Sequence, residues 1–318
     1  MMDPYVSMVV PFYNEEGCIE ELTGSLVEVL ERTGLDYEII YVDDGSTDGT
    51  FEALEKAFLK YKKIKIFRLG KNYGQSAALS AGIDNALGEI IILMDGDLQH
   101  DPEDIPQFIA GIKEGCDIVS GWRKHRSDDL LSRRIPSRAA NWIASRISGV
   151  KIHDFGTTFK AYRREILKSV RLYNNLHRFI PALASWTGAR ICEIEINSPK
   201  RKSGKSKYGI SRTLVVALDL ITINFLLKYK SSPLQFLGKI GLLFSGAGFL
   251  GILLLSAGWL FFGLDMTANR GTLLLAALAV IIGIQFITSG LVAELTCRTY
   301  YETQDKKLYY IKTQKTRE

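Results

Sequence analysis

The chain has 318 residues, of which 47% are hydrophobic, so it is long enough for a complete α/β domain and an additional segment. Its net charge of +5 is modest, and the positive side chains gather between Arg123 and Lys207 and beside apolar segments near the C-terminus. This distribution indicates an anionic partner and argues against a nucleic-acid-binding protein.

The first part of the chain alternates between apolar runs and helical patterns. Apolar side chains such as Leu22, Leu26 and Val29 recur at helical spacing after the first run. Asp101 and Pro102 supply the N-cap and the first turn of a later helix. The predicted strands cover residues 6–12, 37–42, 64–69 and 90–94, and the predicted helices begin near residues 14, 50, 75 and 101. This alternation predicts a largely parallel sheet covered by helices.

The run 90–94 is the most informative of these strands. It is apolar throughout, as expected of a parallel strand buried on both faces, and it is followed by Asp95-Gly96-Asp97. Ligands of open α/β sheets bind beyond the carboxyl ends of the strands, and side chains two apart in a strand share a face. We therefore expect the two carboxylates to hold a small divalent cation on a diphosphate. A polar turn before the next helix is the alternative for an isolated Asp-x-Asp.

Two other predicted strands also end at polar side chains. Tyr13 and Glu15 follow the first strand, and Asp43 and Asp44 follow the second. No Gly-x-Gly-x-x-Gly and no P-loop is present, so neither a dinucleotide-binding fold nor an NTPase is supported. The three strand ends predict a groove for a nucleotide. Helix capping is the alternative for the two aspartates.

Two long apolar runs occupy the C-terminal part of the chain, over residues 236–264 and 273–292. Each exceeds the roughly 20 residues that cross a bilayer, and we interpret them as transmembrane helices. A buried helical hairpin is the alternative. The connection between them carries only Asp265 and Arg270, whereas both flanks are rich in lysine and arginine, so the positive-inside rule places both flanks in the cytoplasm. Residues 214–227 predict an interfacial helix.

The compartment of the first domain is also predicted from the sequence. The N-terminal residues carry neither a basic region nor an early apolar run, so we expect no cleaved leader and a cytosolic first domain. Cys18, Cys116, Cys192 and Cys297 are far apart and lack metal-ligand spacing. Free thiols are therefore expected.

Several motifs resemble those of a known enzyme family. The motifs are Val-Pro-Phe-Tyr-Asn-Glu-Glu (10–16), Val-Asp-Asp-Gly-Ser-Thr-Asp-Gly-Thr (42–50) and Met-Asp-Gly-Asp-Leu-Gln (94–99). They resemble the family 2 glycosyltransferases of GT-A fold. The narrower set is Ser-Gly-Trp-Arg (120–123), Asp154 ahead of Phe-Lys-Ala-Tyr-Arg-Arg, and Arg-Lys-Ser-Gly-Lys-Ser-Lys-Tyr (201–208). With the two-helix tail, this set resembles the polyprenyl-phosphate glycosyltransferases, which include dolichyl-phosphate mannose synthases, bactoprenol glucosyltransferases and undecaprenyl-phosphate aminoarabinose transferases.

The resemblance implies a role for particular residues. The implied nucleotide-sugar contacts are Pro11, Tyr13, Glu15, Val42, Asp43, Asp44, Asp95, Gly96, Asp97, Arg123, Arg201 and Lys207. The implied acceptor-phosphate contacts are Arg123, Arg133, Ser137 and Arg201, and the implied ligands of Mg²⁺ or Mn²⁺ are Asp95, Asp97 and Gln99. A solvated basic surface is the alternative for the cationic cluster, and a disordered linker is the alternative for 200–207. His177 could face the sugar or serve a structural role.

The implied catalytic residues are Asp95, Asp97 and Asp154. A phosphate monoester is already mostly a dianion at pH 7, so its attack on a sugar needs no general base. We therefore expect Asp154 to position the sugar or the metal-bound site, with a structural turn as the alternative.

Taken together, the sequence predicts an α/β protein with four parts. These are a cytosolic GT-A catalytic domain over 1–210, interfacial amphipathic helices over 211–235, a transmembrane hairpin over 236–298 and a cytosolic tail over 299–318. It is expected to be an integral membrane protein with its catalytic domain and both termini in the cytoplasm. A homo-oligomer, by resemblance a tetramer, is also expected.

The expected reaction is an inverting, metal-dependent transfer of a sugar from a nucleotide diphosphate sugar to polyprenyl phosphate. It would give a lipid-linked sugar for envelope glycan or glycoprotein assembly. A UDP-sugar is favoured as donor and GDP-mannose is possible. The alternatives are a metal-dependent nucleotidyl or phosphoryl transferase and a non-catalytic membrane scaffold with a vestigial GT-A domain.

Overall fold

The computed structural model describes residues 3–124, 141–142, 144–146, 148–170, 176–197, 233–265, 268–303 and 309–317. The chain forms two compact units. Residues 1–223 and 307–318 make up an α/β unit, and residues 224–306 make up a helical unit.

The elements of the α/β unit follow the order expected from the sequence. Its strands are β1 (Val6–Phe12), β2 (Tyr37–Asp43), β3 (Ile64–Leu69), β4 (Ile90–Leu93), β5 (Ile118–Trp122), β6 (Lys160–Arg163), β7 (Ile191–Glu195) and β8 (Ile311–Lys315). Its α-helices are α1 (Ile19–Arg32), α2 (Thr50–Lys60), α3 (Gln75–Asp84), α4 (Ile105–Lys113), α6 (Arg164–Ser169) and α7 (Ile180–Ala184). Short 3₁₀ turns lie at η1 (Glu16–Cys18), η2 (Pro102–Asp104), η4 (Leu176–Phe179) and η5 (Ser185–Thr187).

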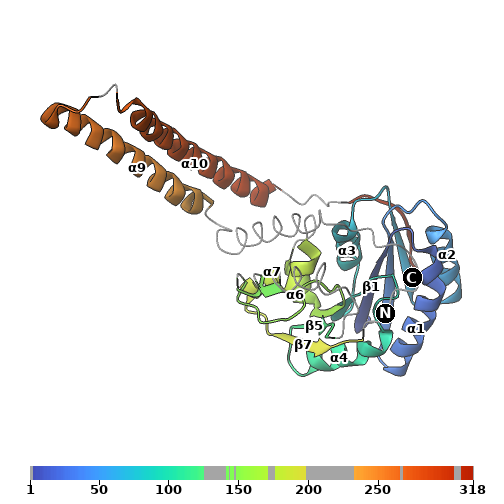
Figure 1. Ribbon diagram of the computed structural model, residues 1–318. Helices are drawn as coiled ribbons and strands as arrows, with labels where there is room; N and C mark the ends of the chain where they lie inside the picture. The colour runs from blue at the N-terminus through green and yellow to red at the C-terminus, as the bar shows by residue number, and fades with distance from the viewer. Residues whose placement is uncertain are drawn as a thin grey trace. The chain divides into compact units, whose positions relative to one another are not determined.

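The described strands form one eight-stranded sheet in the order β7-β5-β6-β4-β1-β2-β3-β8. Figure 1 shows β1 of this sheet between helices α1 and α3. The central pairs β1–β2, β1–β4 and β2–β3 are parallel, as is the outer pair β5–β7. Strand β6 runs antiparallel to β4 and β5, and β8 runs antiparallel to β3. The predicted mostly parallel sheet is thus confirmed. Its parallel central strands end at one edge, where ligands of such sheets bind.

Apolar side chains cover both faces of this sheet. Val6, Met8 and Val10 of β1 pack with α1, α2 and α4, whereas Val9 of the same strand packs with α3, α6 and α7. This alternation follows from the two-residue period of a strand. Every residue of β2 and β4 is buried, which explains why β4 is a continuous apolar run in the sequence.

One detail of the predicted strand 90–94 is wrong. Strand β4 ends at Leu93, where its register with β1 and β6 also ends, so Asp95 and Asp97 lie in the loop beyond it. Their separation by two residues therefore does not place them on one strand face. The loop conformation determines their positions, including a left-handed backbone at Leu98 with φ of 59°.

The C-terminal residues return to the sheet. Residues 299–318 are expected as a tail, and within them Ile311–Lys315 form β8 beside β3. The Tyr309 hydroxyl donates a 2.6 Å hydrogen bond to Asp84 of α3, and the Gly70 N–H donates to the Tyr310 carbonyl at 2.9 Å. A strand of composition Ile-Lys-Thr-Gln-Lys has a single apolar residue, so hydrophobic periodicity does not reveal it.

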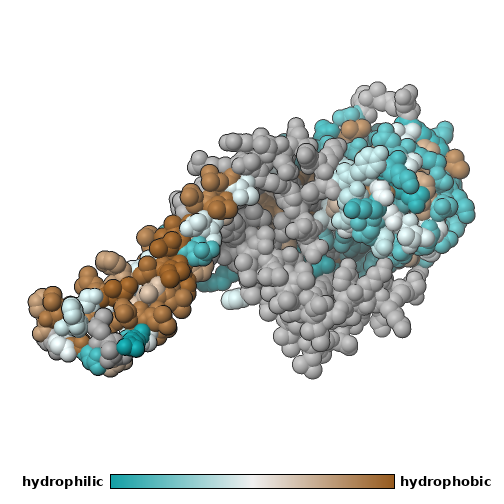
Figure 2. Space-filling model, turned by 90° about the horizontal axis from the view of Figure 1, so that it is seen from above, coloured by the Kyte–Doolittle hydropathy of each residue, from teal (hydrophilic) through white to brown (hydrophobic). Residues whose placement is uncertain are grey.

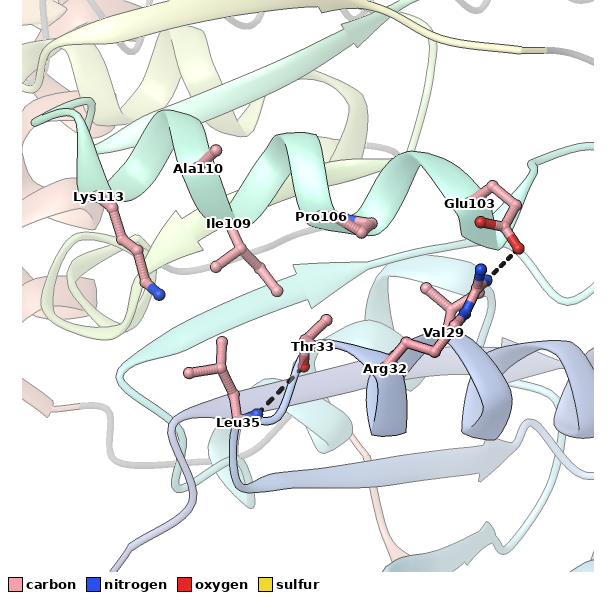
Figure 3. A pocket seen from close by; sticks show the side chains of 9 residues that line it. All are labelled: Val29, Arg32, Thr33, Leu35, Glu103, Pro106, Ile109, Ala110 and Lys113. Carbon is pink, nitrogen blue, oxygen red and sulfur yellow. Dashed lines mark hydrogen bonds and ion pairs between the residues drawn. The ribbon is translucent and has the colours of Figure 1, made fainter.

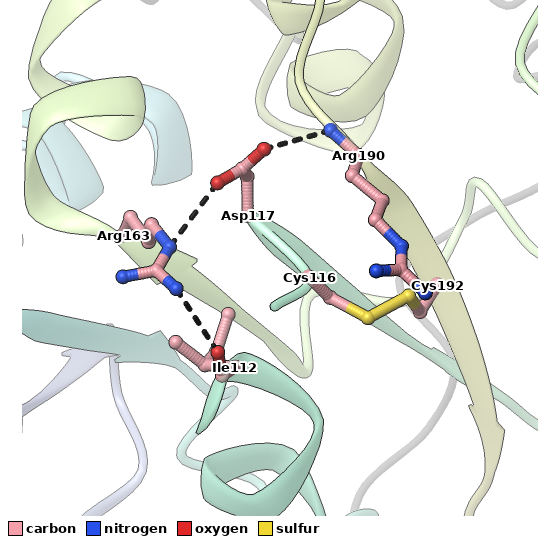
Figure 4. The surroundings of a disulfide bond; sticks show 6 residues. All are labelled: Ile112, Cys116, Asp117, Arg163, Arg190 and Cys192. Atoms are coloured by element: carbon pink, nitrogen blue, oxygen red, sulfur yellow. Dashed lines mark hydrogen bonds and ion pairs between the residues drawn. A yellow bond between two sulfur atoms is a disulfide. The ribbon is translucent and has the colours of Figure 1, made fainter. Parts of the chain in front are cut away.

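The expectation of free thiols is wrong for two of the cysteines. Cys116 and Cys192 form a disulfide across 76 residues of sequence, with their Cα atoms 6.0 Å apart (Figure 4). Cys116 lies just before β5 and Cys192 lies in β7, and these strands are parallel neighbours. Their spacing in the sequence does not indicate this pairing. Cys18 is buried and outside this disulfide, and its Sγ donates to the Glu15 carboxylate at 3.8 Å.

The helical unit consists of α9 (Pro233–Phe262) and α10 (Arg270–Thr303). Residues 237–261 and 270–293 are long and apolar enough to cross a membrane. Figure 2 shows apolar side chains over the hairpin, and Leu243 and Leu274 are 71% exposed. The helices pack through small residues: a Cβ at Gly283 would overlap Ser245 and the Gly241 carbonyl. Outward apolar side chains around a close helix contact are typical of membrane spans rather than of a buried core hairpin.

Candidate active site

Asp95 lies at the centre of the site, in the loop after β4. Its Oδ1 accepts a 2.6 Å hydrogen bond from Nε2 of Gln75, the first residue of α3. Its Oδ2 lies 3.6 Å from Nε2 of His100, and the Asp95 side chain is 30% exposed. The carboxylate is therefore oriented from two sides while part of it faces solvent.

The pKa of Asp95 lies below its usual range. Burial by itself raises the pKa of this carboxyl, but His100, His177 and Thr158 more than offset that effect. Asp95 is consequently a carboxylate at neutral pH, which is the form that binds a cation.

The loop that carries Asp97 and Gln99 is built on β1. A Cβ at Gly96 would lie 2.5 Å from the ring of Phe12, so only glycine allows the loop to pass this close to the strand. The Asp97 carboxylate accepts a 3.2 Å hydrogen bond from the Gln99 N–H, which closes a turn. Both side chains are partly exposed.

The donor set suits a hard divalent cation. Asp95, Asp97 and Gln99 offer two carboxylates and one amide oxygen, the ligand type that Mg²⁺ and Mn²⁺ prefer. Among the described residues, no group of three or more His, Cys, Asp or Glu side chains is arranged to hold a metal ion. A cation here would therefore need further oxygens from a substrate, as Mg²⁺ commonly takes them from phosphates.

The loops after β1 and β2 are tied together at the same edge of the sheet. The Asn14 N–H donates to Ser46 Oγ at 3.0 Å, and the Thr47 N–H donates back to the Asn14 side chain at 2.9 Å. Tyr13 is 37% exposed beside this junction. Of the other residues implied there, Pro11 is partly exposed, Glu15 donates its N–H to Thr50 at 2.9 Å, and Val42 is buried.

Asp43 and Asp44 make contacts within the protein. Asp43 is fully buried, accepts from the Ser46 N–H at 2.9 Å, and lies 3.2 Å from Nε of Arg68. Asp44 is 3% exposed and accepts from the N–H groups of Tyr73 at 2.8 Å and Gly74 at 2.9 Å. These bonds organise loops rather than cap helices. A nucleotide contact from either aspartate stays a prediction.

Asp44 also connects two parts of the site. Burial raises its pKa, and the bonds from Tyr73 and Gly74 act in the opposite direction. Gly74 adopts φ of 92°, and the next residue is Gln75, which holds Asp95. Asp44, directly after β2, therefore supports the loop after β4 through Gly74 and Gln75 at the start of α3.

Arg123 and Asp154 form a two-pronged ion pair. Nε of Arg123 lies 2.8 Å from one carboxylate oxygen and Nη2 lies 3.2 Å from the other. Asp154 is 3% exposed, and its own N–H donates to Glu193 at 3.3 Å. Asp154 therefore fixes the plane of the Arg123 guanidinium, which follows β5. This geometry accords with a positioning role for Asp154.

Some predicted features lie outside the described residues. They are Arg133, Ser137, Arg201, Lys207 and the interfacial segment 214–227.

Four side chains lie around Asp95. The sequence prediction gave no role to three of them, Gln75, His100 and Thr158, and left the role of His177 undecided. Gln75 and His100 contact the carboxylate, and Thr158 lies 3.4 Å from Gln75. His177 is 4% exposed and hydrogen bonds to Ser76 Oγ at 2.8 Å, which anchors it to α3. The sequence offered one signal for each of two of these residues. Gln75 is the first residue of a predicted helix, and His100 directly follows the predicted ligand Gln99.

A separate pocket of about 320 Å³ lies between α1 and α4 (Figure 3). Mostly apolar side chains line it, and the Arg32–Glu103 ion pair closes one side. None of the predicted site residues lines this pocket, so it belongs to helix packing rather than to the site.

Residues 7–171 match the family model described as glycosyl transferase family 2. The chain is 39% identical over 317 residues to dodecaprenyl-phosphate galacturonate synthase of Rhizobium johnstonii, a match that covers 96% of this chain and 92% of that protein. It is 33% identical over 307 residues to undecaprenyl-phosphate 4-deoxy-4-formamido-L-arabinose transferase of Aeromonas hydrophila, covering 96% and 92%. These matches confirm the resemblance drawn from the motifs.

Solved structures share the fold. Glucosyl-3-phosphoglycerate synthase from Mycobacterium tuberculosis, crystallised with Mn²⁺, UDP and glucosyl-3-phosphoglycerate, superposes with a TM-score of 0.53 at 19% identity. The superposition covers 70% of this chain and 79% of that chain. At this level of identity the likeness establishes the α/β fold and nothing about ligands.

Proposed function

The chain belongs to glycosyl transferase family 2, and from this we propose that it transfers a sugar from a nucleotide diphosphate sugar to polyprenyl phosphate. The observation that carries the proposal is the loop after β4, where Asp95 and Asp97 present partly exposed carboxylates at the ligand-binding edge of the sheet. The relatives named for dodecaprenyl and undecaprenyl phosphate support the acceptor, because the similarity extends through the apolar hairpin.

Asp95, Asp97 and Gln99 are proposed to hold Mg²⁺ or Mn²⁺ on the donor diphosphate. When bound, the cation would neutralise diphosphate charge and act as a Lewis acid that favours departure of the nucleoside diphosphate. Gln75 and His100 orient Asp95 for this purpose. Such groups outside the ligand set commonly fix the direction of a ligating carboxylate.

The proposed transfer is a single displacement with inversion. An oxygen of the acceptor phosphate forms a bond to the anomeric carbon as the bond from that carbon to the nucleoside diphosphate breaks. Arg123, oriented by Asp154, would donate hydrogen bonds to phosphate oxygens. Because the acceptor is mostly dianionic at pH 7, no side chain needs to remove a proton from it.

The return of β8 to the sheet supports the proposed membrane topology. Strands β3 and β8 belong to one folded unit, and α9 and α10 lie between them in the sequence. The chain must therefore cross a membrane an even number of times between these strands, which suits two spans. With the positive flanks, this supports a topology in which both termini and the α/β unit are in the cytoplasm. The domain limits 1–210, 211–235, 236–298 and 299–318 are part of this proposal, with the last including β8.

A UDP-sugar is the proposed donor, with GDP-mannose as the competing candidate. The relatives' names mention galacturonate and a formamido-arabinose, so acidic and amino sugars should be included in a test. The partners also include membrane lipid and, in the proposal, further copies of this chain in a tetramer. Crosslinking in the membrane would test the tetramer.

The test is to incubate the full chain in lipid nanodiscs with undecaprenyl phosphate and one labelled donor at a time. The donors are UDP-galacturonic acid, UDP-glucuronic acid, UDP-glucose, UDP-4-deoxy-4-formamido-L-arabinose and GDP-mannose. We expect label from one donor in the organic extract. Release of a sugar 1-phosphate or a nucleoside monophosphate from the donor would favour the nucleotidyl or phosphoryl transferase instead, and no turnover with any donor would favour the scaffold.

A further inference from the structure

Lys160 is a fully buried lysine between the two parts of the site, which are Asp95 and the Arg123–Asp154 ion pair. In β6 it pairs in register with Leu93 of β4 on one side and with Ser120 of β5 on the other. Asp95 follows two residues after Leu93, and Arg123 follows three residues after Ser120. The lysine thus lies between β4, which leads to Asp95, and β5, which leads to Arg123.

The Lys160 amino group binds the loop that precedes its own strand. Nζ donates to the carbonyl oxygen of Phe155 at 3.2 Å and to the carbonyl oxygen of Thr157. The loop 154–158 therefore wraps around a single side chain. Removing that side chain would leave two carbonyls in a buried environment without this donor.

This loop connects the two parts of the site. At one end, Asp154 forms the ion pair with Arg123. At the other end, Thr158 lies beside Gln75, which holds Asp95. A shift of the loop would therefore move the partner of the Arg123 guanidinium, whereas Asp95 is also held by Gln75 and His100, which lie outside the loop.

The cost of burying an amine makes a simple packing role a poor explanation. Burial, assisted by Arg123, lowers the pKa of Lys160 to about 7, although Asp154, Asp95 and Glu193 act to raise it. A methionine of similar length would fill the space without that cost. A neutral amine retains two N–H donors, so Lys160 can hold both carbonyls in either protonation state.

We propose that Lys160 is a positioning residue for sugar transfer, which holds the loop 154–158 so that Asp154 directs Arg123. This inference rests on the proposed function. Lys160 itself touches no substrate and acts through Arg123.

The test compares Lys160→Met and Lys160→Arg with wild type, in the full chain in nanodiscs with the donor identified above. Lys168→Met, at an exposed position on α6, is the matched control. We expect Lys160→Met to unfold near the wild-type temperature and to bind Mn²⁺ and UDP with affinities within about threefold of wild type. Its kcat/KM for polyprenyl phosphate should fall about 100-fold, the loss typical of a small misplacement of a reacting group. Lys160→Arg should recover at least about tenfold of that loss, since it restores the donors.

A double-mutant cycle separates positioning from general damage to the fold. If Lys160 acts through Arg123, adding Lys160→Met to Arg123→Ala should lower kcat/KM by no more than about twofold beyond the loss of Arg123→Ala alone. Full additivity of the two losses would overturn the proposal. So would wild-type kcat/KM in folded Lys160→Met, or no recovery in folded Lys160→Arg. If Lys160→Met does not fold, the activity of Lys160→Arg and a double-mutant cycle of Lys160→Arg with Arg123→Ala decide whether Lys160 acts through Arg123.

The outcome for wild type keeps the two proposals distinct. A wild type that transfers no sugar would overturn the proposed function, and this inference with it. A wild type that transfers sugar alongside an equally active Lys160→Met would overturn the inference alone.

Discussion

The two parts of the candidate site differ in what their charged groups face. The carboxylate half, which comprises Asp95, Asp97 and Gln99, keeps the Asp95 side chain 30% exposed. In the cationic half, which comprises Arg123 and Asp154, the side chains are 14% and 5% exposed and pair with each other. The carboxylate half is arranged to receive a ligand that brings positive charge. The cationic half is assembled within the protein, so its carboxylate serves to orient a cation.

Loss of a carboxylate in the first half should have the largest effect. Asp95→Asn or Asp97→Asn removes a charge that no neighbouring group replaces as a cation ligand, so kcat should fall about 1,000-fold or more with little change in the fold. Transfer of labelled sugar to lipid measures this. Glu52→Gln, at an exposed carboxylate on α2, is the matched control. EDTA should have the same effect, and full activity in chelator would contradict the metal assignment.

Loss of Arg123 should come next. Arg123→Ala would remove the proposed phosphate contact and leave Asp154 buried without its main cation, so kcat/KM should fall about 100-fold or more. Arg123→Lys keeps the charge but cannot form two parallel hydrogen bonds, so about a tenfold loss is expected. Steady-state kinetics with each substrate varied would show this order. Equal activity of Arg123→Ala and wild type would remove Arg123 from the site.

Substitution of Asp154 should have a graded effect. Asp154→Asn retains one acceptor for Arg123 but loses its charge, so roughly a tenfold reduction of kcat at pH 7 is expected. Wild type and variant should both lose activity below about pH 6 as the acceptor phosphate becomes protonated. The pH profile of each measures this. A variant that is inactive at pH 7 and recovers steeply at alkaline pH would identify Asp154 as a general base.

The disulfide lies away from the reacting groups of either half and should have a smaller effect on activity. Reduction of Cys116–Cys192 leaves the backbone pairing of β5 and β7 intact, so activity should stay within about twofold. Stability should fall by roughly 2–4 kcal/mol, because a cross-link mainly limits the unfolded chain. Activity and thermal unfolding with and without reductant test this. A large loss of activity without unfolding would show that the β5–β7 edge controls the cationic half.

The smallest effect concerns pH and the buried lysine between the halves. The pKa of Lys160 is lowered to about 7 in the folded chain, from an ordinary value of 10.5. Between these values the unfolded chain binds more protons than the folded chain, so wild-type stability should rise with pH. Relative to Lys160→Met, the unfolding temperature of wild type should increase by a few degrees from pH 7 to pH 9. Parallel profiles for the two proteins would contradict the lowered pKa.

The sequence predicted the parallel strands well, and it indicated the loop that carries the carboxylate half, because both leave local signals. An apolar run that is buried on two faces is continuous, as in β4, and the carboxylates follow it directly. The capping signal at Asp101 was similarly local, since its side chain accepts from the Glu103 N–H two residues later.

The remaining features depend on contacts between distant residues. Gln75 reaches Asp95 through the position of α3, and Arg123 meets Asp154 across 31 residues. The disulfide and β8 likewise depend on which strands are neighbours. Hydrophobic periodicity carries no information about such pairs, so the sequence indicated charged residues near the site without their partners.

The most direct test of the account is the stoichiometry of a single reaction. Wild type and Asp97→Asn, each as full chain in nanodiscs with polyprenyl phosphate and the active labelled donor, would be assayed for lipid-linked sugar and for released nucleotide. The account predicts one nucleoside diphosphate for each labelled lipid in wild type, and neither product in Asp97→Asn. A sugar 1-phosphate or a nucleoside monophosphate as the released product, or undiminished transfer by Asp97→Asn, would contradict it.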